Sequence, residues 1–273
     1  MKTLVHYTKR PYIYALILTI GMTILHTIVV TSSIQKYLFS AALLYLLLLF
    51  ELIGTKYFVV HKSKQLSLVK GDKKHRRAHI VHHLILPSLL FLSIVSFMIV
   101  SAQLNVIALI MIATFVLYSI LFTNVRSYYE NDNKLEHRTA NIYDVVCIIS
   151  AFLLIYSLLV LIVNSQLSFV ISGLLISEIM IVLGYLTLSR YQLVNNKGLT
   201  ILVGMLVVYL NVFFFLTNLH VTLMLQTISA TFIYYYFVVI VSHINDKSFT
   251  WKVLIEYLAI FVLLFVLMIL GKF

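Results

Sequence analysis

The chain has 273 residues, of which 62% are hydrophobic and only 11% are charged. A soluble domain carries about 25% charged residues, and a soluble chain of this length could not bury so much apolar surface, so a water-soluble globular protein is excluded. The net charge of +11 does not indicate nucleic-acid binding, because the basic residues lie in short loops between apolar runs, where membrane topology explains them.

Nine segments of the chain are long and apolar enough to cross a bilayer, which requires about 20 residues in a helix. Helices are required because lipid offers the backbone no hydrogen-bond partners. The sequence therefore predicts an all-α, polytopic membrane helix bundle that forms a single transmembrane domain over residues 1–273. In chain order the predicted spans are 11–31, 37–59, 80–101, 104–124, 143–164, 167–188, 199–217, 220–242 and 252–271.

The Lys and Arg residues predict the orientation of these spans. With the N-terminus inside, 18 of the 20 fall in cytoplasmic segments, and only Lys36 and Lys272 lie outside. Such an excess is the positive-inside signature of multi-pass membrane proteins. The pattern predicts four helical hairpins plus a last helix, with the C-terminus outside. We expect the membrane to be the cytoplasmic membrane of a prokaryote.

Two glutamates lie inside predicted spans, where a carboxylate at the bilayer centre costs roughly 2.5–3.5 kcal/mol on insertion scales. Glu178 lies halfway along span 167–188, and Glu51 lies in the cytoplasmic half of span 37–59. Tyr185 shares the helix face of Glu178, because seven residues make about two turns. The cost of these carboxylates makes both glutamates candidate ligand-binding or ion-binding residues.

Polar residues also recur on single faces of the neighbouring helices. The residues that complete the candidate site with Glu178, Tyr185 and Glu51 are Asn211, Gln226 and Tyr236. One interpretation is a polar intramembrane cavity around Glu178 that binds or transports a small molecule or ion. The other is a set of ordinary hydrogen bonds between helices. Gly173, Ser177 and Gly184 form a separate face of small residues, which predicts close helix contact.

The inner loop 61–79 is strongly basic. A cluster of this kind beside a membrane predicts contact with anionic lipid headgroups, although it can also act only as a topology determinant. Docking of a cytoplasmic protein partner is a third possibility. The candidate headgroup-binding residues are Lys70, Lys73, Lys74, Arg76 and Arg77.

Four histidines follow in the same region, namely His75, His79, His82 and His83. On a helix they share one broad face, and imidazoles so placed can bind a transition metal. The run resembles a histidine box of the membrane fatty-acid desaturase and hydroxylase group. That resemblance implies a lipid-modifying enzyme with a di-iron centre at the cytoplasmic surface. The group uses several boxes, whereas the other inner histidines here are isolated, so the sequence favours a non-enzymatic role. A non-catalytic scaffold subunit is the remaining alternative, and no cofactor is indicated.

The predicted orientation can be tested with single cysteines in a Cys147→Ala background. We expect Lys36→Cys and Lys272→Cys to react with a membrane-impermeant maleimide in intact cells. Lys247→Cys should react only after permeabilisation, because it lies on the predicted inner side. Protection of Lys272→Cys in intact cells would mean that the number of spans is even.

Overall fold

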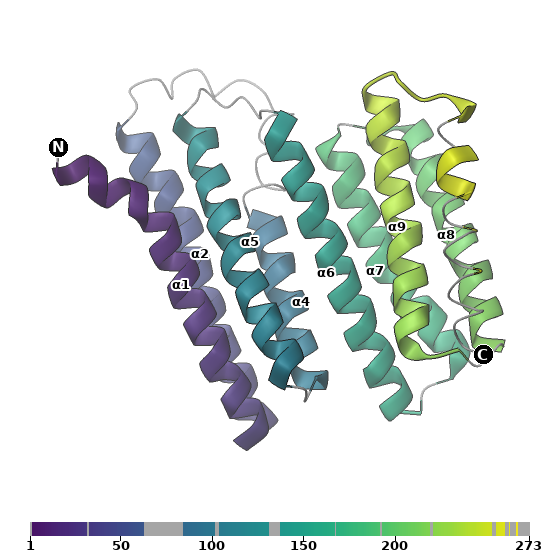
Figure 1. Ribbon diagram of the computed structural model, residues 1–273, viewed down its shortest axis with the longest axis horizontal. Helices are drawn as coiled ribbons and strands as arrows, with labels where there is room; N and C mark the ends of the chain where they lie inside the picture. The colour runs from purple at the N-terminus through teal and green to yellow at the C-terminus, as the bar shows by residue number, and fades with distance from the viewer. Residues whose placement is uncertain are drawn as a thin grey trace. The chain divides into compact units, whose positions relative to one another are not determined.

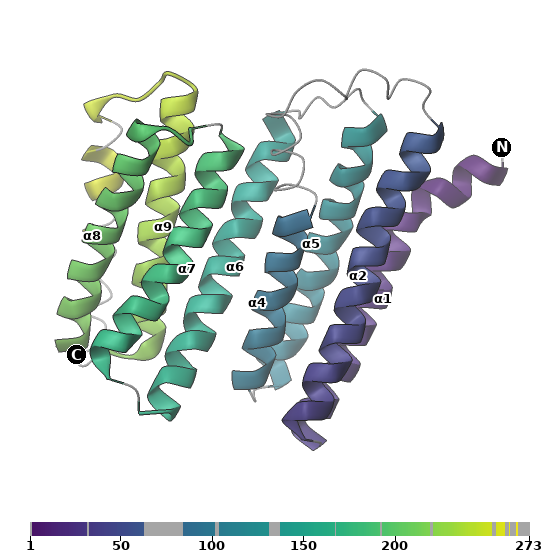
Figure 2. The same ribbon diagram turned by 180° about the vertical axis from the view of Figure 1, so that it is seen from behind.

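The computed structural model describes residues 2–31, 33–62, 84–101, 104–130, 137–166, 168–191, 193–218, 221–252 and 255–259, with the single positions 262 and 266. Within these residues the long elements are all helices, shown from two sides in Figures 1 and 2. They are α1 (Lys2–Thr31), α2 (Ile34–Lys62), α4 (Leu86–Val100), α5 (Leu104–Glu130), α6 (His137–Asn164), α7 (Phe169–Arg190), α8 (Asn196–Asn218) and α9 (Leu223–Asn245).

Seven of these helices are long and apolar enough to cross a membrane, namely all of them except α4. The protein is therefore a multi-pass helical membrane protein, as its composition predicts. The predicted span 80–101 is represented by the 15-residue helix α4, and the residues directly before position 84 lie outside the described part. Most of the predicted span 252–271 also lies outside it. The count of nine spans stays a prediction.

The chain divides into two compact units, residues 1–146 and 147–273. Helix α6 contributes to both, and the prediction of a single transmembrane domain stays a prediction. In the first unit α1 packs against α5 and α2, and α4 contacts all three of these helices. The pairing of α1 with α5, which are distant in sequence, gives this unit its core.

Tyrosine hydroxyls attach the short helix α4 to its neighbours. The Tyr37 hydroxyl of α2 donates to the Val95 carbonyl at 2.7 Å, and the Tyr118 hydroxyl of α5 donates to the Pro87 carbonyl at 3.1 Å. Tyr37 and Tyr118 are both fully buried. A buried tyrosine provides a large apolar ring and also a donor that needs a partner, so each of these bonds fixes a helix contact.

In the second unit α7, α8 and α9 pack against one another. The predicted small-residue face of α7 is confirmed at both glycines. A Cβ at Gly184 would collide with a methyl group of Leu202 on α8, and a Cβ at Gly173 would touch Phe213. Small residues therefore let α8 approach α7 closely, as expected for helices in a membrane.

Many threonine and serine hydroxyls in the described helices are satisfied locally. The Thr19 hydroxyl donates to the Ala15 carbonyl at 2.8 Å, and Thr23, Thr114 and Thr123 make the same bond one turn back. Such bonds remove an unpaired donor from the hydrocarbon without needing another helix. Several polar residues of the predicted stripes are therefore compatible with lipid contact.

Candidate functional site

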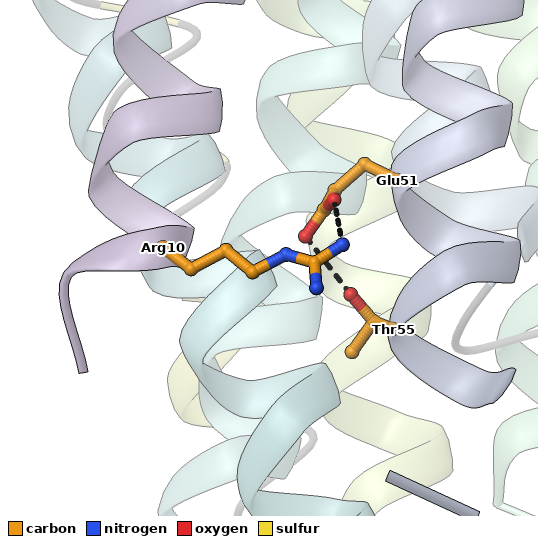
Figure 3. A network of polar contacts seen from close by, with 3 residues as sticks. All are labelled: Arg10, Glu51 and Thr55. Atoms are coloured by element: carbon orange, nitrogen blue, oxygen red, sulfur yellow. Dashed lines mark hydrogen bonds and ion pairs between the residues drawn. The ribbon is translucent and has the colours of Figure 1, made fainter. Parts of the chain in front are cut away.

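The first polar site is an ion pair between α1 and α2 (Figure 3). The Arg10 Nη2 atom donates to Glu51 Oε2 at 2.9 Å, and the Thr55 hydroxyl donates to Glu51 Oε1 at 2.9 Å. The Glu51 side chain is 3% exposed and that of Arg10 is 26% exposed. The Arg10 guanidinium also lies over the Tyr14 ring, 5.4 Å from its centroid. Both oxygens of the carboxylate are therefore occupied by donors from the protein.

The hairpin geometry explains this pairing. From Arg10 to the end of α1 is 21 residues, and from the start of α2 to Glu51 is 17. At about 1.5 Å per residue, the two positions lie about 32 Å and 26 Å from the turn. A difference of about 6 Å is within reach of an arginine side chain. In the sequence, Arg10 counts only as one of the basic residues that predict the orientation. Its depth in the hairpin is close to that of Glu51, and this match could have revealed the pair.

Glu178 lies in a different environment from Glu51. It occupies the middle of the candidate span Val170–Arg190, and its side chain is exposed on the surface of α7. Tyr185 is 48% exposed on the same face, together with Leu174 and Ile181. Within the described residues, the Glu178 carboxylate makes no hydrogen bond or ion pair. The structure thus brings Glu178 and Tyr185 to one face, as predicted, and this face points outward.

The other candidate residues do not converge on Glu178. The Asn211 side chain is exposed and donates to the Val207 carbonyl of its own helix at 2.8 Å. The Gln226 amide donates to the Val221 carbonyl at 3.3 Å, just before α9 begins. Tyr236 forms an edge contact with Tyr257, with ring centroids 6.1 Å apart. The amides of Asn211 and Gln226 are satisfied by local bonds and not by bonds between helices.

A second buried polar cluster, which sequence reasoning missed, links α7 and α9. The Tyr234 side chain is fully buried, and its hydroxyl lies 2.8 Å from that of Thr187. The Thr187 hydroxyl in turn donates to the Leu183 carbonyl at 3.0 Å. The Cys147 thiol of α6 contacts the same tyrosine hydroxyl. Tyr234 thereby connects three helices, and no spacing within one segment could have revealed a contact between residues so far apart in sequence.

The predicted loop sites lie outside the described residues. This applies to the candidate headgroup-binding residues 70–77 and to the histidines at 75, 79, 82 and 83. Elsewhere in the described ranges, no three His, Cys, Asp or Glu side chains are grouped as a metal site would require. The lipid-headgroup and metal hypotheses therefore stay predictions.

Comparison with known proteins adds no assignment. No family model, curated protein or solved structure matches the chain.

The Arg10–Glu51 pair can be tested by a double-mutant cycle. Glu51→Leu leaves a partly buried guanidinium without its carboxylate, and we expect it to destabilise the protein by about 2 kcal/mol, less than for a fully buried pair. The double variant Arg10→Met/Glu51→Leu should regain most of that loss, because neither charge remains. Loss of helix on heating, followed by circular dichroism in one detergent, measures both. If the stability losses of the two single variants add up to the loss of the double variant, Arg10 and Glu51 are not coupled.

The Tyr234 cluster predicts the effect of removing one hydroxyl. Tyr234→Phe should destabilise the second unit by about 1 kcal/mol, the usual value of one buried hydrogen bond. The single cysteine, Cys147, is buried, so a fluorogenic maleimide reports the temperature at which this unit opens. Tyr185→Phe, on an exposed face, is the matched control and should leave that temperature unchanged. Equal effects of the two variants would argue against the cluster.

Proposed function

We propose that this protein binds or transports a small molecule or ion within the membrane, and that Glu178 is the ionisable group that carries this activity. The contrast between the two intramembrane glutamates supports the proposal. A glutamate that serves only the fold is neutralised by the fold, as Glu51 is by Arg10 and Thr55. Glu178 has no such partner among the described residues.

The position of Glu178 makes that contrast chemically significant. A charged carboxylate at the middle of a span costs roughly 2.5–3.5 kcal/mol, and bound protons or cations remove that cost. The described residues do not cover this side chain, which is exposed on α7. Proton or cation binding by Glu178, coupled to the movement of a small molecule, is the mechanism we infer.

The surroundings of Glu178 indicate how the binding cavity would be completed. On either side of it along α7 the exposed side chains are apolar, including Leu174 and Val182. The exposed face of α7 around Glu178 would form one wall of the proposed cavity. The polar cavity predicted around Glu178 remains part of this proposal.

The exposed face of α7 also favours one alternative function. A non-catalytic subunit could bury Glu178 against a partner helix, because intramembrane carboxylates also pair across helix interfaces. This alternative makes a different prediction. A buried docking residue is shielded by protein, whereas a binding residue responds to protons and cations.

Carbodiimide labelling separates the two functions. A hydrophobic carbodiimide modifies carboxyl groups in apolar surroundings, and peptide mass spectrometry identifies the modified residue. In protein reconstituted into vesicles, we expect Glu178 to be labelled, with labelling reduced at high pH and by added Na⁺ or K⁺. Ion flux into the same vesicles, followed with a pH-sensitive dye, should fall at least tenfold in Glu178→Gln.

Glu51 provides the matched control for both measurements. It lies in the membrane like Glu178 but is paired with Arg10, so it should remain unlabelled. Labelling of Glu178 that does not change with pH or cations, together with unchanged flux in Glu178→Gln, would reject the proposal. Absence of labelling, with cross-linking from position 178 to another protein, would support the scaffold function instead.

A further inference from the structure

A hollow of about 410 Å³ lies on the surface of the first unit, where α1 ends and α2 begins. It is open to the outside of the unit and is separate from Glu51 and Glu178. The residues that line it are Ile28, Gln35, Lys36, Phe39 and Ser40.

The lining combines one cation with neutral donors and an apolar wall. Lys36 provides an ammonium group, and the side chains of Gln35 and Ser40 provide further hydrogen-bond donors. In the part of the chain that the structure describes, no carboxylate lies within ion-pair distance of Lys36. Ile28 and Phe39 form the apolar part, and Phe39 is 68% exposed. The hollow therefore suits a ligand that has both an anionic group and a hydrocarbon part.

The depth of these residues matches the layers of a bilayer. Lys36 lies in the first turn of α2, at the end of the candidate span Ile34–Thr55. Phe39 is three residues further along, about 4.5 Å deeper at the helical rise. With the span Ile34–Thr55 across a bilayer, Lys36 would lie near the level of the lipid phosphates and Phe39 one turn nearer the hydrocarbon.

We propose that this hollow binds one anionic phospholipid, with its phosphate on Lys36 and Gln35 and an acyl chain against Phe39 and Ile28. A lysine near the membrane surface attracts the anionic headgroups of phospholipids. One lysine near the surface contributes about 1 kcal/mol, which corresponds to about a fivefold preference over a zwitterionic lipid. The proposal is independent of the role of Glu178.

Tryptophan quenching by brominated lipids measures this preference directly. The chain has one tryptophan, Trp251, so Phe39→Trp in a Trp251→Phe background places a single fluorophore in the hollow. In mixed vesicles, we expect brominated phosphatidylglycerol to displace phosphatidylcholine at position 39 with about a fivefold preference. Adding Lys36→Gln should reduce the preference to about one, whereas Lys36→Arg should retain it.

Leu38→Trp in the same background is the matched control. Leu38 is 54% exposed at nearly the same depth, but it does not line the hollow. It should therefore report no preference. Equal preferences at positions 38 and 39, or a preference that survives Lys36→Gln, would overturn the proposal.

A soluble anion is distinguished by adding inorganic phosphate at constant ionic strength. Phosphate lacks an acyl chain to contact Phe39, so the preference for phosphatidylglycerol should persist. Its loss would assign the hollow to a free anion and would overturn the lipid proposal.

Discussion

The absence of water in the hydrocarbon of the bilayer is the constraint on which this structure depends. Every polar group in a span must find its partner within the protein, and unsatisfied groups cost several kcal/mol. The backbone meets this requirement by forming helices, and many threonine hydroxyls meet it by bonding one turn back, as Thr19 does. For three larger or charged side chains the partner comes from another helix. Tyr37, Tyr234 and Glu51 each follow that rule, so the same constraint that fixes the helices also fixes how they pair.

The two intramembrane glutamates show how this constraint separates structure from function. The carboxylate of Glu51 is held by Arg10 and Thr55, and it fastens α1 to α2. Glu178 is the same residue type and also lies within a candidate span, yet the described part of the protein supplies it with no partner. A group left without an internal partner points to something outside its own unit. A proton, a cation or another protein surface would be the partner of Glu178.

The helix-face argument from sequence succeeded for some residues and failed for others. It placed Glu178 with Tyr185 and the small residues Gly173 and Gly184 on their correct faces, because helical periodicity decides which residues lie together. It could not decide which face is covered. Asn211 was placed either in a polar cavity or in a hydrogen bond between helices, and its side chain is exposed in the described unit with its amide bonded to its own helix. Periodicity describes one helix, whereas burial depends on its neighbours.

The sequence by itself determined that the chain is a helical membrane protein and where seven of its spans lie, because composition and the length of apolar runs decide both. It also identified Glu178 as the costly residue in the middle of a span. The tertiary structure alone decided that Glu51 is neutralised by Arg10, that α1 packs on α5, and that Tyr234 meets Thr187. These contacts join residues from different helices. They form only when the helices pack together. The residue pattern within one segment does not show how that segment packs against the others.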